Sequence, residues 1–207
     1  MLKTIALVIL ATGAPACGGA SDPSEDLVGR WDLHDDETGE LEAIYAFDDD
    51  GTYRYREYGE APESHAGTYE TDGGLLLFDG TDDAGTHLNA EVSYFADDER
   101  FLLGALLPDG EVDGPVGAWS GSIRVESEGE LTVDSETTYR LEANGTAVVT
   151  ARDQDENRTI DDATWEEEAG EIVVSFTLES IDFHIHMVLI EGAAMGSPIF
   201  ERAAEGS

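Results

Sequence analysis

The sequence is nearly without lysine and cysteine. Lys3 is the only lysine and Cys17 the only cysteine, so the chain cannot form an internal disulfide. Nine arginines are the remaining cations. They stand against 47 aspartates and glutamates and leave a formal net charge of −37. Proteins bind nucleic acid by neutralising phosphates with cationic groups, so we expect no nucleic-acid partner. An anionic membrane surface would likewise repel this chain.

The acidic residues are spread along the whole chain instead of forming one tract. This distribution favours solubility in a salty medium, where ions screen the self-repulsion. The alternative is that the charge attracts cations or a basic protein partner.

Catalytic signatures are also missing from the sequence. It has no P-loop, no dinucleotide-binding fingerprint and no Gly-x-Ser-x-Gly elbow around a nucleophilic serine. Acidic pairs are too abundant to indicate general acid–base chemistry. We therefore predict a protein that is not an enzyme and that has no cofactor.

Residues 1–16 have the features of a secretory signal peptide. Lys3 gives the start a positive charge, residues 5–11 form an unbroken apolar run, and residues 12–16 are small and turn-prone. The apolar run is too short to span a bilayer as a helix, which takes about 20 residues. The alternative is a small buried helix at the N-terminus.

Cys17 follows the small residues directly and begins a flexible polar tether, residues 17–26. Its position resembles the lipobox of bacterial lipoproteins, in which a diacylglyceryl group is attached to the cysteine. The resemblance implies a membrane anchor at Cys17. Gly18 follows instead of Asp, which implies an outer-membrane address facing the periplasm or the cell surface. The family usually has leucine where this chain has Ala14, and ordinary signal cleavage that leaves a free thiol is the alternative.

Beyond the tether, short segments of alternating apolar and polar residues are separated by turns rich in Asp, Gly and Asn. Residues 41–47 alternate in this way, residues 48–51 form an acidic turn, and residues 52–58 return. Helical periodicity is almost absent. The pattern is typical of antiparallel β-structure. We predict an all-β fold, an antiparallel up-and-down β-barrel or sandwich, in two tandem repeats of six to seven strands.

Landmarks of the first half recur in the second half in the same order. Trp31, in Val-Gly-Arg-Trp, is matched by Trp119, in Val-Gly-Ala-Trp, and three further landmarks follow. An internal duplication predicts one β repeat over residues 27–107 and another over residues 116–203. A linker rich in proline and glycine, residues 108–115, joins them. Coincidence among similar hairpins is the alternative.

These motifs resemble the small bacterial lipocalin-like domains, which are secreted or lipoprotein modules built as up-and-down barrels. The resemblance covers both halves. It implies that the opening tryptophan closes the barrel floor beneath an arginine from a late strand. Trp119 and Arg202 fit these places in the second half, where a cation–π contact would join them. Trp31 opens the first half, for which Arg100 is the candidate arginine.

Aromatic residues recur at alternating positions in the first half. An eight-stranded barrel is either filled by its own side chains or holds one small ligand. The aromatic residues are candidates for a ligand-facing wall whose hydroxyls would orient a small apolar ligand. The alternative is that they are good strand formers that fill the core. The candidates are Tyr45, Phe47, Tyr53, Tyr55 and Tyr69.

His184 and His186 are candidate metal ligands. Residues two apart on a strand point to the same face, which Asp182 shares. Such a set can bind zinc or copper. The spacing fixes no third ligand, and an exposed His-x-His strand without a metal is the alternative.

Three functions therefore stay open. The first is a non-enzymatic envelope lipoprotein that binds a small apolar ligand or another envelope component. The second is an acidic structural or protein-interaction module with filled barrels, and the third is a periplasmic metal-binding lipoprotein. A carrier needs an internal cavity, whereas an interaction module needs a filled interior and an exposed apolar patch.

Overall fold

The computed structural model describes residues 26–35, 38–59, 62–154, 156–190, 193–196 and 198–203. Cys17, the signal-like segment and most of the tether lie outside these residues. The described strands are all paired antiparallel in one sheet, which confirms the predicted all-β antiparallel fold. No described helix is long and apolar enough to cross a membrane. The strands are β1 (Gly29–His34), β2 (Leu41–Phe47), β3 (Thr52–Glu57), β4 (Ser64–Asp72), β5 (Leu75–Asp82), β6 (His87–Ala96), β7 (Arg100–Leu103), β8 (Leu107–Pro108), β9 (Gly117–Ser127), β10 (Glu130–Leu141), β11 (Thr146–Asp153), β12 (Glu156–Glu168), β13 (Glu171–Leu178), β14 (Ile181–Ile190), β15 (Ala194–Gly196) and β16 (Phe200–Arg202).

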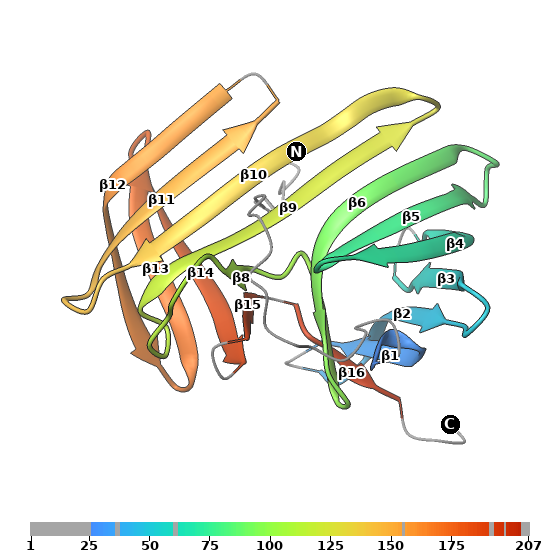
Figure 1. Cartoon of the computed structure of the whole chain (residues 1–207), viewed down its shortest axis with the longest axis horizontal. Coiled ribbons are helices and arrows are strands. Elements are labelled where there is room, and N and C mark those ends of the chain that lie inside the picture. The colour runs from blue at the N-terminus through green and yellow to red at the C-terminus, as the bar shows by residue number, and fades with distance from the viewer. Residues whose placement is uncertain are drawn as a thin grey trace.

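Strand β6 is the place where the two halves of the sheet join. One edge of β6 pairs with β5, while the other edge pairs with β9 through residues 88–92 and with β7 through residues 94–96. From β7 the sheet continues through β16 and β1 back to β2. Strands β1 to β7 therefore close with β16 into an eight-stranded barrel (Figure 1).

The second half extends the same sheet from β9 to β15 (Figure 1). Leu106 exchanges two backbone hydrogen bonds with Met195 of β15, at 2.8 and 2.9 Å, and the following residues pair with β9 as β8. This short segment thus connects β15 to β9. The predicted linker at 108–115 begins inside it, because Pro108 pairs with Trp119.

The opening tryptophans of the two halves make the same contact. The indole N–H of Trp31 donates to the backbone oxygen of Leu27, and that of Trp119 donates to the backbone oxygen of Pro115, each at 2.8 Å. Both indoles are fully buried. Each tryptophan thereby ties the start of its half to the chain four residues earlier.

The first hairpins of the two halves are also built alike. The hydroxyl of Tyr69 donates to the backbone oxygen of Asp48 at 3.1 Å, and the indole N–H of Trp165 donates to the backbone oxygen of Glu142 at 2.8 Å. The repeated landmarks of the sequence therefore correspond to repeated contacts in space.

Arg202 corrects the predicted barrel closure. Its guanidinium carbon lies 4.3 Å from the ring centre of Trp31, in the first half, and not over Trp119. The reason is that β16 pairs with both β1 and β7, which the barrel needs for closure. Arg100 instead forms an ion pair with Asp97 at 2.7 Å. The last strand of the chain therefore completes the barrel of the first half.

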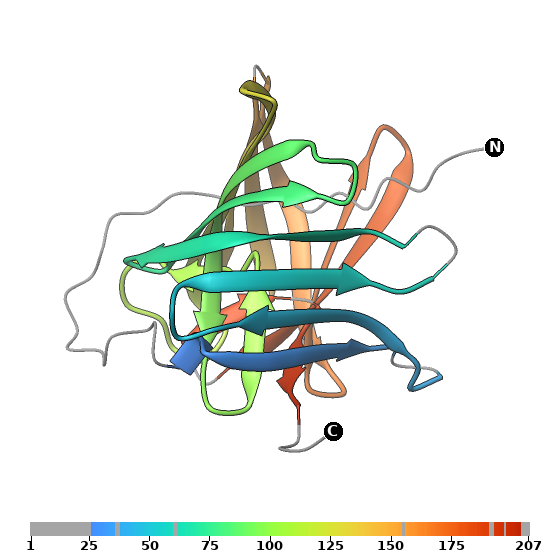
Figure 2. The same cartoon turned by 90° about the vertical axis from the view of Figure 1, so that its right-hand side faces the viewer.

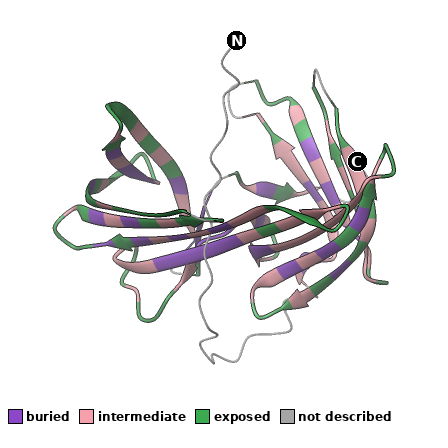
Figure 3. Cartoon of the chain, turned by 90° about the horizontal axis from the view of Figure 1, so that it is seen from above, coloured by how far each residue is buried: buried purple, intermediate pink, exposed green. Residues whose placement is uncertain are grey.

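Burial alternates along the strands, as the apolar–polar alternation predicts (Figure 3). The core of the first half is mainly aromatic, whereas that of the second half is mainly aliphatic. The largest fully buried side chains are Trp31, Trp119, Tyr53, Phe47, Phe101, Leu27, Leu76, Leu102, Leu141, Ile172 and Met195.

Candidate functional site

The interior of the first barrel is occupied by its own rings. Tyr45 on β2 lies 6.1 Å from Phe78 on β5, 5.7 Å from Phe101 on β7 and 5.4 Å from Phe200 on β16, measured between ring centres. These strands are distributed around the barrel, so the rings meet across it. Side chains that contact one another across an eight-stranded barrel take the volume that a ligand would need.

Four of the five predicted ligand-wall residues belong to this packed core. Tyr45, Phe47, Tyr53 and Tyr69 are all buried, and Tyr69, the most exposed of them, is 8% exposed. Burial raises the pKa of Tyr53 to about 12 and raises the pKa of Tyr45 well above its usual value. Their position agrees with the alternative interpretation of these residues as core fillers.

Tyr55 lies at the end of the barrel where β3 finishes and is only partly buried. Its ring stacks on His65 at 4.6 Å, and its hydroxyl donates to Glu57 at 3.3 Å. His65 contacts the hydroxyl of Tyr53 through Nδ1 at 3.1 Å, and burial lowers the pKa of this imidazole. Sequence reasoning missed His65. The signal was the alternation along β4: His65 is two residues from Gly67 and four from Tyr69, so it shares the inward face with them.

The predicted metal ligands His184 and His186 are exposed on the outer face of β14. Nδ1 of His184 lies 2.9 Å from Oγ of Ser175, and Nδ1 of His186 lies 2.9 Å from Oε2 of Glu171. A group of three or more His, Cys, Asp or Glu that could hold a metal does not occur among the residues that the structure describes. The described chain therefore does not supply the third ligand that the spacing left open.

A groove of about 690 Å³ on the outer side of β1, β2 and β3 gathers three of the nine arginines. Arg30 on β1 and Arg54 on β3 flank Ala46 of β2 in the pairing register, and Arg56 on β3 lies opposite Ile44. Apolar side chains thus form the floor between guanidinium groups.

Two of these arginines are fixed by aspartates. Arg30 binds Asp32 through Nε at 2.7 Å and through Nη2 at 3.0 Å, while Arg54 binds Asp48 at 2.9 Å. The guanidinium of Arg56 instead lies over the ring of Tyr58, 5.1 Å from its centre. The arginines are therefore held in place beside the floor of the groove.

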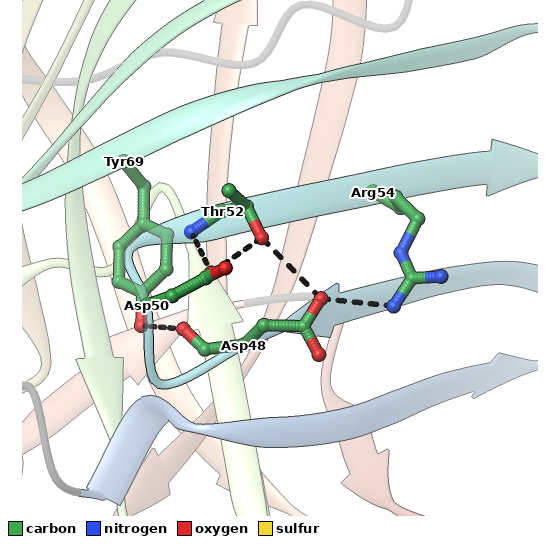
Figure 4. Close-up of polar contacts among 5 residues, drawn as sticks. All are labelled: Asp48, Asp50, Thr52, Arg54 and Tyr69. Carbon is green, nitrogen blue, oxygen red and sulfur yellow. Dashed lines mark hydrogen bonds and ion pairs between the residues drawn. The ribbon is translucent and has the colours of Figure 1, made fainter.

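Asp48 and Asp49, in the acidic turn at residues 48–51, line part of this groove. Asp50 accepts hydrogen bonds from the backbone N–H and the hydroxyl of Thr52, at 3.0 and 2.6 Å (Figure 4), and these bonds lower its pKa. Tyr69 and Arg54 hold Asp48 from two sides. The carboxylates of Asp48 and Asp50 thus form hydrogen bonds within the hairpin, as the turn sequence predicts.

The lining of the groove consists of arginines, aspartates and apolar side chains. Serine, cysteine, histidine and lysine are all absent from its described residues. Guanidinium groups beside an apolar floor fit a ligand that has an anionic group next to an apolar part.

A second groove, of about 390 Å³, lies on the outer side of β4, β5, β6 and β9. Glu70, Asp79, Glu91 and Glu126 contribute carboxylates to it, and Arg124 is its one cation. Arg124 donates to Glu126 at 2.7 Å. This groove spans the junction of the two halves and has the charge that a basic partner would need.

The comparisons with known proteins give no match: no family model, no curated protein and no solved structure is similar to this chain.

Proposed function

We propose that this protein is a non-enzymatic envelope lipoprotein, anchored through Cys17, that binds an anionic amphiphilic envelope component in the outer groove of β1–β3. The anchor and the outer-membrane address rest on the signal-like residues 1–16 and on Cys17. The lipocalin-like interpretation rests on the repeated motifs. The proposed function needs neither a cofactor nor a metal.

One observation carries the location of the binding site. The rings of β2, β5, β7 and β16 meet inside the first barrel, so the interior does not offer the apolar cavity of a carrier. The outer groove combines apolar floor and fixed guanidinium groups. The ligand is therefore proposed outside the barrel, contrary to the expected wall of tyrosines.

Two fluorescent probes test this location. 1-Anilinonaphthalene-8-sulfonate carries an anionic group on an apolar body, whereas N-phenyl-1-naphthylamine is neutral. We expect the chain from Ser21 to Ser207 to bind the anionic probe and not the neutral one. Replacing the two β3 arginines together, Arg54→Gln and Arg56→Gln, should weaken binding of the anionic probe about tenfold, because charge-assisted hydrogen bonds are lost.

A cavity variant provides the control. Phe101→Ala removes a ring from the packed interior, and a cavity of that kind binds small apolar molecules. This variant should gain binding of the neutral probe. If the unchanged protein already binds the neutral probe, the interior is hollow and the carrier function replaces the proposed one.

A basic protein partner is the second candidate. It is favoured by the carboxylates of the groove that spans β6 and β9. Binding of a lysine-rich peptide that weakens steeply with salt, and that fails after Glu91→Gln and Glu126→Gln, would support it.

A further inference from the structure

Strand β14 has one edge that is only partly paired. Along its first eight residues it pairs with β13, but β15 covers only Val188–Ile190 on the other side. In the described part of the chain, no strand pairs with that other side of residues 181–187. Figure 2 shows the β13–β14 hairpin, in orange at the upper right, apart from the strands of the first barrel. An unpaired edge presents free N–H and C=O groups to any strand that can reach it.

The free segment has the composition of a strand that accepts a partner. Its inner face is formed by Ile181, Phe183, Ile185 and Met187. Ile181 is 60% exposed, the most exposed large apolar side chain among the described residues. The segment contains no proline, no register shift and no inward charge, which are common devices that protect an edge from pairing.

We propose that this edge pairs antiparallel with the same edge of a second copy of the chain, centred on His184. This proposal does not depend on the groove of β1–β3. Antiparallel pairing about His184 puts Asp182 of each copy opposite His186 of the other copy. The pairing therefore contains two contacts between a carboxylate and an imidazole. On the inner face, Phe183 lies opposite Ile185 and Ile181 opposite Met187. The pairing would cover Ile181 with apolar surface.

The self-complementary order of these residues is the reason for choosing a second copy as the occupant. A segment that reads Ile-Asp-Phe-His-Ile-His-Met places apolar residues opposite apolar residues when it meets itself in this register. No two carboxylates face each other, and His184 lies opposite its own counterpart. A closed pairing about a twofold axis also leaves no further β14 edge for growth into a fibre.

The net charge of the whole chain opposes this association. At −37 per copy, two copies repel each other at low ionic strength, and added salt screens the repulsion. Association through β14 should therefore strengthen with salt. An association between the acidic chain and a basic protein would weaken instead, which separates the two kinds of partner.

Disulfide trapping tests the register directly. The chain from Ser21 to Ser207 contains every described residue and no cysteine. His184→Cys would face its own counterpart, at a distance that a disulfide can span. We expect this variant to form a covalent dimer under mild oxidation at least about tenfold faster than Glu166→Cys, an exposed control position on the outer side of β12.

Sedimentation equilibrium gives the second measurement. The unchanged chain should associate about tenfold more tightly in 1 M than in 0.05 M sodium chloride. Ile181→Lys, which puts a cation on the exposed end of the inner face, should reduce association while leaving the circular dichroism spectrum unchanged. A chain that stays monomeric at high salt, or a His184→Cys variant that is oxidised no faster than the control, would overturn the proposal. Both results leave the probe binding at β1–β3 untouched, so the two proposals fail separately.

Discussion

Arg202 joins three separate parts of the chain through one side chain. Its guanidinium stacks on Trp31 and donates to the backbone oxygens of Asp98, Val28 and Asp26 at 2.8, 2.9 and 2.5 Å. Asp26 and Val28 lie in the segment before β1, whereas Asp98 lies in the turn between β6 and β7. A neutral side chain could not replace both the stacking and the three charge-assisted bonds.

We therefore expect Arg202→Gln to lower the free energy of unfolding by about 3 kcal/mol. Urea denaturation followed by circular dichroism measures the change. Arg140→Gln removes the same charge from an exposed position on β10 and should stay within about 0.5 kcal/mol of the unchanged protein. Equal effects of the two substitutions would show that only the charge matters and that the stacking on Trp31 contributes nothing.

His65 makes stability depend on pH near neutrality. Burial lowers the pKa of its imidazole, against the opposing effect of Glu63 and Asp82. The unfolded chain then binds the proton more readily than the folded chain, so folding is favoured above the unfolded pKa of about 6.5 and loses stability as pH falls below it. We expect the unfolding free energy of the unchanged protein to decrease from pH 7.5 to pH 5.5 more than that of His65→Gln. If both proteins have the same slope, His65 does not contribute to the pH dependence.

At the scale of elements, strands β4 and β5 approach each other through a pair of glycines. Gly67 lies directly opposite Gly80, and a Cβ atom on Gly67 would lie 1.9 Å from the backbone oxygen of Asp79. A Cβ atom on Gly80 would lie 2.5 Å from the hydroxyl of Tyr53. The large tyrosine is accommodated because its neighbours have no side chain.

Gly67→Ala should therefore cost about 3 kcal/mol, since the clash is with backbone that cannot move without separating the strands. The second half has Ala163 at the corresponding position of its repeat, where a Cβ atom is already accommodated. Ala163→Gly should cost only about 1 kcal/mol. Thermal denaturation of both variants checks the contrast, and a mild Gly67→Ala would mean that β4 can shift away from β5.

At the scale of the molecule, a net charge of −37 works against the compact state. The ion pairs of the described residues use only a small part of the 47 acidic groups. Most carboxylates therefore repel one another across the surface, at a strength that depends on screening.

We expect the melting temperature to rise by several degrees between 0.05 and 1 M sodium chloride. The rise should be steepest below about 0.2 M, because the screening length there is comparable to the distances between neighbouring surface charges. Measurement at low protein concentration excludes an effect of association. A flat dependence would show that the repulsion is already relieved in the folded state, for instance by bound cations.

The sequence by itself determined the local structure. Alternation of apolar and polar residues set which side chains face inward, turn residues such as those at 48–51 set where hairpins reverse, and the repeated landmarks predicted repeated contacts. These features depend on neighbours along the chain. Only the tertiary structure decided which strand closes the barrel. That choice depends on which sheet edges remain unpaired in space, so Arg202 reached Trp31 and not Trp119. The same holds for the rings that fill the interior. It also holds for Arg30 and Arg54, which the register of three strands places on either side of Ala46.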